Sequence, residues 1–258
     1  MNEQTTSTSK VPSVTLGFWI IKIAATTLGE TGGDAVTMTL NLGYLVGTLI
    51  FAGLLVIALG AQISAKRFHP LAYWAAIIAT TTVGTTLADF VDRSLGVGYW
   101  GGASILFALV LVSLFAWHLA CGSISADRID SRRVELFYWL TILCSQTLGT
   151  ALGDWLADDT GLGYEGGALV FGAGLVLVVV LSYLTKLSRT LLFWTAFILT
   201  RPLGATVGDF LDKPRAHGGL EFGRFTASAV LLGFIALCLL VIPQRAGNHP
   251  GSEADAAS

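Results

Sequence analysis

The chain has 258 residues, of which 53% are hydrophobic and 12% are charged, and its formal net charge is −2. Soluble domains carry about twice that share of charged residues, and the chain has no basic tract of the kind that binds nucleic acid. The composition therefore excludes an ordinary soluble domain and predicts an integral membrane protein whose surroundings are the lipid bilayer.

Apolar segments long enough to approach or span a bilayer follow one another along the chain. They predict an all-α membrane protein with about eight transmembrane helices, over residues 14–34, 43–62, 71–91, 101–121, 135–157, 165–185, 190–210 and 225–243. We expect a single transmembrane domain over residues 14–243. The polar segments 1–13 and 244–258 are expected to be disordered.

A repeated pattern divides the eight segments into four units of two helices. Each unit has a tryptophan, a glycine ten residues later, an aspartate five residues after that, and a second glycine nine residues further on. The units cover about residues 14–64, 70–122, 135–186 and 190–243. Their tryptophans are Trp19, Trp74, Trp139 and Trp194, and their aspartates are Asp34, Asp89, Asp154 and Asp209.

The loops indicate an orientation in the membrane. Lys and Arg are frequent after the second, fourth and sixth segments, for example at Lys66, Arg133 and Lys186. Because short positive loops stay in the cytoplasm, both termini are predicted to be cytoplasmic. The four tryptophans then lie at the cytoplasmic interface as anchors, and Lys22 is expected to extend its amine toward that interface.

The repeated aspartate follows its tryptophan by 15 residues, about 22 Å along a helix. A carboxylate in the outer part of the membrane needs a partner or an aqueous cavity. Positions 8 and 11 after the tryptophan share a helix face with the aspartate. We therefore predict a polar path inside the bundle, formed with the aspartates by Thr27, Glu30, Thr82, Thr85, Thr147 and Thr150.

Small residues occupy positions 10 and 14 after each tryptophan. This small-x-x-x-small spacing lets helices approach closely in lipid, so we expect the first helices of the four units to pack together along it. The residues are Gly29, Gly33, Gly84, Ala88, Gly149, Gly153, Gly204 and Gly208.

The fourth unit departs from the pattern by placing Arg201 at position 7. An arginine inside the membrane needs a partner. We predict that Arg201 pairs with Glu30, which only the first unit has, or with one of the repeated aspartates. The alternative is that Arg201 extends to the cytoplasmic face.

Oxygen ligands without His or Cys suit hard divalent cations such as Mn²⁺, Mg²⁺ or Ca²⁺, or protons. The predicted ligands are Glu30, Asp34, Asp89, Asp154 and Asp209. Internal repeats around a polar site are typical of secondary transporters. The leading hypothesis is therefore proton-coupled transport of a small cation such as manganese, with no catalytic residue, no covalently bound cofactor and no nucleic-acid partner.

Two other functions stay open at this point. The aspartates can instead cap helices in a structural or sensory membrane protein, because Asp often bonds its own backbone where a helix ends. An intramembrane enzyme is the less favoured alternative. Intramembrane aspartyl proteases use the motifs Y-D and G-x-G-D, and this chain has neither, since Asp34 lies in TGGD and Asp154 in ALGD.

The four W-x9-G-x3-[GA]-D units resemble the bacterial "repeat of unknown function" family, whose members are membrane proteins with four tandem two-helix repeats, each bearing a tryptophan. The resemblance covers Trp19 to Ile242 and implies this fold and a location in the bacterial inner membrane, while the oligomeric state stays open. A more limited similarity links GETGGD to the E-x-G-D motif of cation/proton exchangers that handle manganese and calcium. Here an extra residue separates Glu30 from Asp34.

Overall fold

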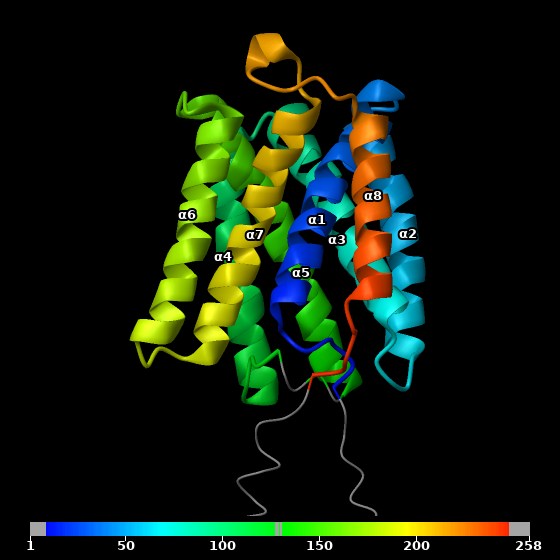
Figure 1. Cartoon of the computed structure of the whole chain (residues 1–258), viewed down its shortest axis with the longest axis vertical. Coiled ribbons are helices and arrows are strands. Elements are labelled where there is room, and N and C mark those ends of the chain that lie inside the picture. Colours follow the sequence, from blue (N-terminus) through cyan, green and yellow to red (C-terminus); the bar gives the residue numbers. More distant parts are fainter. Residues whose placement is uncertain (1–8, 127–128, 130, 248–258) are drawn as a thin grey trace, which may run out of the picture.

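The computed structural model describes residues 9–126, 129 and 131–247, and the regular structure within them is helical (Figure 1). Eight long helices lie close to the predicted ranges. They are α1 (Leu16–Asp34), α2 (Tyr44–Ser64), α3 (Pro70–Asp89), α4 (Tyr99–Cys121), α5 (Arg132–Asp154), α6 (Gly163–Leu184), α7 (Arg189–Asp212) and α8 (Arg224–Val241). A short 3₁₀ turn, η4 (Arg215–His217), lies between α7 and α8.

The repeated aspartates do not end the helices in which they lie. After Asp34, Asp89 and Asp154 the chain continues into π-helical turns, η1 (Ala35–Thr39), η2 (Phe90–Ser94) and η3 (Trp155–Asp159). These three aspartates have right-handed helical backbone and make no side-chain cap hydrogen bond, and α7 runs three residues beyond Asp209. Helix capping therefore does not account for the repeated carboxylate.

The odd-numbered helices form a closed inner ring. Helix α1 packs against α3, α3 against α5, α5 against α7, and α7 returns to α1. Each even-numbered helix lies outside this ring and packs against the inner helix of the following unit, so that α2 contacts α3, α4 contacts α5, α6 contacts α7 and α8 contacts α1. The four units thus interlock in a cycle, and the last unit is a neighbour of the first (Figure 1).

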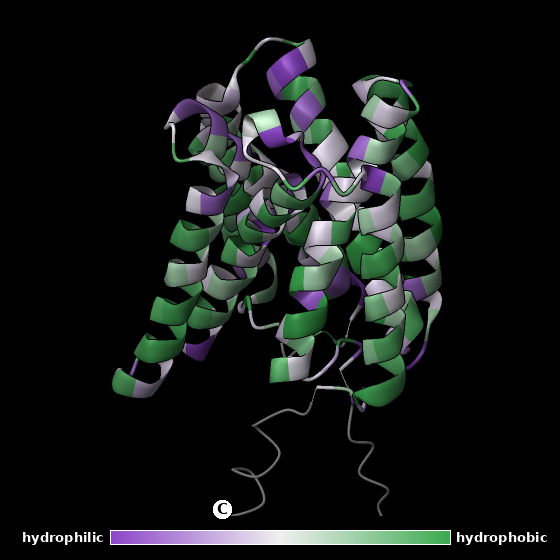
Figure 2. Ribbon diagram, turned by 45° about the horizontal axis from the view of Figure 1, so that its top comes forward, coloured by the Kyte–Doolittle hydropathy of each residue, from purple (hydrophilic) through white to green (hydrophobic). Residues whose placement is uncertain are grey.

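Six of the eight helices are long and apolar enough to cross a membrane, namely α2, α3, α4, α6, α7 and α8. Hydrophobic residues run along the outer helices in Figure 2. Only 11% to 22% of the apolar stretch of each outer helix is buried, against 72% for α3 and 61% for α7. Exposed apolar surface of this extent is typical of a membrane-embedded protein. The two remaining helices, α1 and α5, belong to the inner ring.

Aromatic side chains close the end of the ring at which the odd helices begin. Trp74, Trp139 and Trp194 are at most 3% exposed. Tyr73 packs against both Trp74 and Trp139, and its hydroxyl lies 2.8 Å from that of Tyr138. The interfacial anchoring predicted for these three tryptophans is wrong, because their rings pack inside the bundle and not against lipid.

The segments 9–13 and 244–247, at the two limits of the described residues, pack against this aromatic end. The amine of Lys10 lies 2.9 Å from Glu135 Oε2, and the amides of Ser13 and Gly247 donate to the carbonyls of Arg245 and Val11. Residues 9–13 and 244–247 belong to the segments that were expected to be disordered, and the structure gives them defined contacts. Ordered packing therefore extends beyond the predicted limits of 14 and 243, while residues 1–8 and 248–258 of those segments lie outside the described residues.

Candidate functional site

Three layers of buried side chains lie within the ring, and each inner helix contributes one residue to each layer. The residues stand 7, 11 and 15 positions after the tryptophan, so that successive layers are four residues apart on one helix face. All twelve are at most 3% exposed. The layers are Thr26, Thr81, Gln146 and Arg201; Glu30, Thr85, Thr150 and Ala205; and Asp34, Asp89, Asp154 and Asp209.

The side chains of the first layer pack against glycines of the preceding inner helix. A Cβ at Gly149 would lie 2.3 Å from Arg201 Cγ, and a Cβ at Gly204 would lie 2.2 Å from the Thr26 hydroxyl. Gly29 faces Thr81 and Gly84 faces Gln146 in the same way. The close packing predicted from the small residues is therefore confirmed, and it is cyclic, because the glycine of the last unit receives a side chain of the first.

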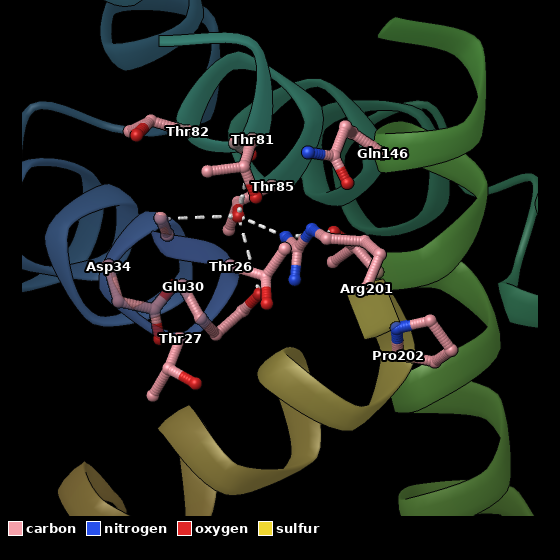
Figure 3. A network of polar contacts seen from close by, with 12 residues as sticks. Thr26, Thr27, Glu30, Asp34, Thr81, Thr82, Thr85, Gln146, Arg201 and Pro202 are labelled. Carbon is pink, nitrogen blue, oxygen red and sulfur yellow. Dashed lines mark hydrogen bonds and ion pairs between the residues drawn. The ribbon is translucent and has the colours of Figure 1, made fainter. Parts of the chain in front are cut away.

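Arg201 connects all four inner helices at the second layer (Figure 3). Its Nη2 donates to Glu30 Oε2 at 2.9 Å and to the hydroxyls of Thr85 and Thr150. The predicted pairing of Arg201 with Glu30 is confirmed, and extension to the cytoplasmic face is wrong, because Arg201 is fully buried. A buried ion pair of this kind depends on such additional hydrogen bonds to offset the loss of water.

The polar path differs from the predicted one at position 8. The hydroxyls of Thr27, Thr82 and Thr147 donate to carbonyls four residues earlier in their own helices, at 2.8 to 3.0 Å. In Figure 3 the side chains of Thr27 and Thr82 point away from Arg201. Hydroxyls satisfied by their own backbone need no partner in the ring. The structure therefore brings Thr85 and Thr150 to Arg201, and leaves the other three threonines beside the layers.

Lys22 lies one helical turn before the first layer and is a second buried cation. Its side chain is fully buried, with Nζ 3.4 Å from Gln146 Oε1 and Thr200 Oγ1 and 4.0 Å from the centre of the Phe197 ring. The expectation that Lys22 reaches the interface is wrong. Its spacing of four residues before Thr26 was a signal in the sequence that it shares the inner face.

Basic residues near the aspartates hold the third layer together in two pairs. Arg93 lies 3.0 Å from Asp89 Oδ1 and 3.3 Å from Asp154 Oδ2. Lys213 lies 2.8 Å from Asp34 Oδ2 and 3.0 Å from Asp209 Oδ1. Each base follows its own aspartate by four residues and bridges to the aspartate of the next unit, so the repeated carboxylates meet in twos at a single level of the ring.

A third basic residue, Arg224 at the start of α8, extends the cluster toward the loops. Its Nε lies 3.5 Å from Asp34 Oδ2 and 3.5 Å from Asp212 Oδ2. Four residues of this cluster were not predicted from the sequence to belong to the site, namely Arg93, Lys213, Arg224 and Asp212. For Arg93 and Lys213 the available signal was the spacing of four residues from the aspartate, which places opposite charges side by side on a helix.

Three of the predicted ligands form a compact set. Glu30, Asp34 and Asp209 each have a carboxylate oxygen within 4.8 Å of those of the other two, and all three residues are buried. Asp34 Oδ1 is buried without a hydrogen-bond partner among the described residues. Asp89 and Asp154 belong to the other pair. The five predicted ligands therefore divide into a set of three and a set of two.

A family model described as Repeat of Unknown Function (DUF347) matches the chain four times, at residues 17–68, 72–122, 137–188 and 192–243. The protein belongs to this family. Each DUF347 repeat coincides with one inner helix and the outer helix that follows it, so the sequence repeat is also the structural unit of the ring. Searches of curated proteins and of solved structures gave no match.

The DUF347 repeats share their carboxylate but not the residues around it. Only the first repeat has the glutamate at position 11, and only the fourth has the arginine at position 7. The structure places these two side chains in one ion pair, because the fourth repeat closes the ring against the first. The repeats are thus equivalent in fold and unequal in charge.

Proposed function

We propose that this protein is an integral membrane transporter that exchanges a small hard cation, such as Mn²⁺, for protons. The observation that carries the proposal is the convergence of Glu30, Asp34 and Asp209 on one buried place within the ring. Carboxylate oxygens are the ligands that Mn²⁺, Mg²⁺ and Ca²⁺ prefer. Buried ionisable groups between membrane helices commonly belong to ion pathways.

The charge balance of the cluster supports exchange with protons. Among the described residues, the ion pairs at this end of the ring connect six carboxylates to four basic groups. Several bases are shared between two carboxylates, so the negative charges exceed the positive ones by two, and either protons or a cation can neutralise this excess. Because ligands must lose their protons before they bind a metal ion, cation binding and proton release are coupled.

All eight helices span the membrane in this proposal. They include α1 and α5, which belong to the inner ring and pack against other helices there. The loop charges support an orientation with both termini on the cytoplasmic side of a bacterial inner membrane. The carboxylate end then faces outward, where its bases are partly accessible: Arg93 is 29%, Arg224 21% and Lys213 12% exposed. The aromatic end is the cytoplasmic barrier, and transport requires the inner helices to separate there.

Transport by the purified protein in proteoliposomes tests the proposal. An inward manganese gradient is expected to drive manganese uptake and a matching proton efflux, followed by a pH dye trapped inside. Asp34→Asn removes a ligand charge at the proposed site and is expected to lower the uptake at least about tenfold, the loss that corresponds to roughly 1.4 kcal/mol of binding free energy. Asp159→Asn, at an exposed aspartate of the same end, is the matched control and should leave uptake unchanged.

A structural or sensory role is the second candidate, and one observation favours it. Each of the five predicted carboxylates already has a basic partner at 3.5 Å or less. A cluster of paired charges can stabilise the ring without binding any ion. Manganese flux that is absent from the wild-type protein, or that persists in Asp34→Asn, Asp89→Asn and Asp154→Asn, would favour this candidate over transport.

A further inference from the structure

The charges in the third layer repeat twice around the ring, although the helices repeat four times. Only the second and fourth repeats have a base four residues after the aspartate, Arg93 and Lys213, and the first and third repeats have Met38 and Asp158 there. The layer consequently has two comparable halves. One holds Asp89, Asp154 and Arg93, and the other holds Asp209, Asp34 and Lys213.

Arg93 is held in its half by more than its two carboxylates. Its Nη1 donates to the Tyr44 hydroxyl at 3.3 Å, and its guanidinium lies 5.6 Å from the centre of the Tyr99 ring and 6.0 Å from that of Tyr44. A guanidinium combines a permanent charge with a planar set of donors and stacks on aromatic rings. Arg93 is therefore a fixed counter-ion.

Lys213 has a different setting. The tyrosine that follows the second glycine in the first three repeats is replaced in the fourth by Gly219, so one of the two rings that flank Arg93 has no equivalent here. Lys213 also lies just beyond the end of α7, where the backbone leaves the helix and Pro214 follows. An ammonium on a flexible stem at the start of a loop can leave its carboxylates by rotation of its own side chain.

The Lys213 amine remains charged while it is paired. Its Nζ lies 2.8 Å from Asp34 Oδ2 and 3.0 Å from Asp209 Oδ1, and an opposite charge at this distance favours the charged form of an amine. The group between the two aspartates is thus a cation, and its position is evidence that this pair of carboxylates accommodates a positive ion. Lys213 leaves as an ammonium and carries its charge away with it.

The Lys213 half also has the additional oxygen ligand. Glu30 lies on this side, and the residue at the same place two repeats later is Thr150. Asp34 is 1% exposed, and its Oδ1 has no hydrogen-bond partner among the described residues. The Lys213 half therefore has three carboxylates. Arg201 pairs with Glu30 and Arg224 lies 3.5 Å from Asp34 Oδ2, but Asp34 Oδ1 is left over. The Arg93 half has only two carboxylates, and Arg93 pairs with both.

We propose that the four repeats form one exchangeable cation site, in which Lys213 is an internal cation that a divalent metal ion displaces, and that Arg93 permanently closes the equivalent place in the other half. This inference rests on the cation site proposed above and limits it to one ion per chain. Lys213 is a competitor in this arrangement, and its removal should strengthen binding.

Manganese(II) binding to the full-length protein in detergent micelles tests this inference, with free Mn²⁺ measured by electron paramagnetic resonance. The wild type is expected to bind one ion. Lys213→Met should tighten binding by about tenfold or more, and Lys213→Arg should weaken it by about tenfold or more, because a guanidinium pairs more firmly with two carboxylates. Arg215→Lys, at an exposed arginine of the loop that follows α7, is the matched control and should keep one ion at unchanged affinity. Arg93→Lys alters the other half, which lacks the third carboxylate, and should not add a second ion.

A gain of function provides the second arm. Arg93→Lys combined with Thr150→Glu gives the closed half the residues of the open half, and the double variant is expected to bind two ions. Circular dichroism melts identify any variant that fails to fold. Lys213→Arg keeps the positive charge between the two aspartates, so it still tests the inference if Lys213→Met does not fold.

Two ions bound by the wild type, equal responses to Lys213→Arg and Arg93→Lys, or no manganese binding by the wild type and Lys213→Met would each overturn the inference. The transport measurement is independent of it. One bound ion without proton-linked flux would support the single site and refute the transporter. Proton-linked flux combined with two bound ions would support the transporter and refute the single site.

Discussion

Arg201 and Glu30 show how a single buried ion pair depends on its surroundings. Both side chains are within the ring, and the Nη2 of Arg201 has three oxygen partners from three different helices. Removing one partner of such a pair leaves an uncompensated buried charge, whereas removing both leaves none. The pair is therefore expected to respond to substitution in a strongly non-additive way.

A double-mutant cycle tests this coupling. Arg201→Gln and Glu30→Gln are each expected to lower the free energy of unfolding by about 3–5 kcal/mol, and the double variant should lose much less than their sum. Thermal and denaturant melts in detergent measure the effect. Arg189→Gln, at an exposed arginine at the start of the same helix, should change little. Additive losses would show that the two charges do not depend on each other.

At this scale the sequence supported part of the site. The pairing of Arg201 with Glu30 or with one of the repeated aspartates followed from the rule that an arginine in a membrane needs a partner, and the structure selects Glu30. The bases Arg93 and Lys213 were not assigned, because they lie beyond the predicted helices, where side chains are ordinarily in contact with water. Their spacing of four residues from an aspartate indicates a pair only if the helix continues past that aspartate. The same physical reason concealed Arg224.

The inner helices are defined by close packing through small residues. At Gly29, Gly149 and Gly204 a Cβ would come within 2.4 Å of a side-chain atom of the neighbouring helix. Extra atoms at such contacts force backbones apart. Some glycines of the outer helices are open instead, since nothing lies within 4 Å of a Cβ built at Gly53, Gly60 or Gly172.

Alanine at these two kinds of glycine should have opposite effects. Gly204→Ala is expected to destabilise the protein by about 1–3 kcal/mol through overpacking against Thr26. Gly172→Ala on α6 is the matched control and should be neutral or slightly stabilising, because alanine has the higher helix propensity. Thermal melts of the two variants in the same detergent measure the difference. A Gly204→Ala protein as stable as the wild type would contradict the close packing of α7 against α1.

The element boundaries could be predicted well because each helix is a long apolar run with a repeated internal landmark. Whether the tryptophan side chains face the membrane interface or the interior of the bundle could not be predicted. An indole near a helix end satisfies either a membrane interface or a buried aromatic cluster, and the choice depends on which neighbours are present. Here Tyr73, Tyr138 and the other rings supply that environment.

The molecule as a whole is a cycle of four equivalent units. Helix α8 of the last unit packs against α1 of the first, as each earlier outer helix packs against the next inner helix. The two limits of the described residues are adjacent, because the segments near Val11 and Gly247 pair through backbone hydrogen bonds. The contacts within the ring are therefore of the same kind at the junction of the last and first units as at the other three junctions.

A circular permutant tests this cycle. Joining the two ends by a short flexible linker and opening the chain between Ser64 and Pro70 should give a folded protein with unchanged manganese affinity, because no helix is cut and the new ends lie in an exposed loop. Far-ultraviolet circular dichroism and the manganese titration measure the outcome. A permutant opened within α5 should fail to fold. If the loop permutant fails as well, the order of the units matters and the cycle is not equivalent at every joint.

The sequence by itself determined the properties that depend on spacing along one helix. These are the four units, the level of the carboxylates and the small residues through which helices approach. The tertiary structure decided the properties that depend on which units become neighbours. Lys213 and Asp34 are 179 residues apart in the chain and meet only because the ring closes. The physical reason is that periodicity describes a helix face, whereas the charge opposite that face belongs to whichever helix packs there.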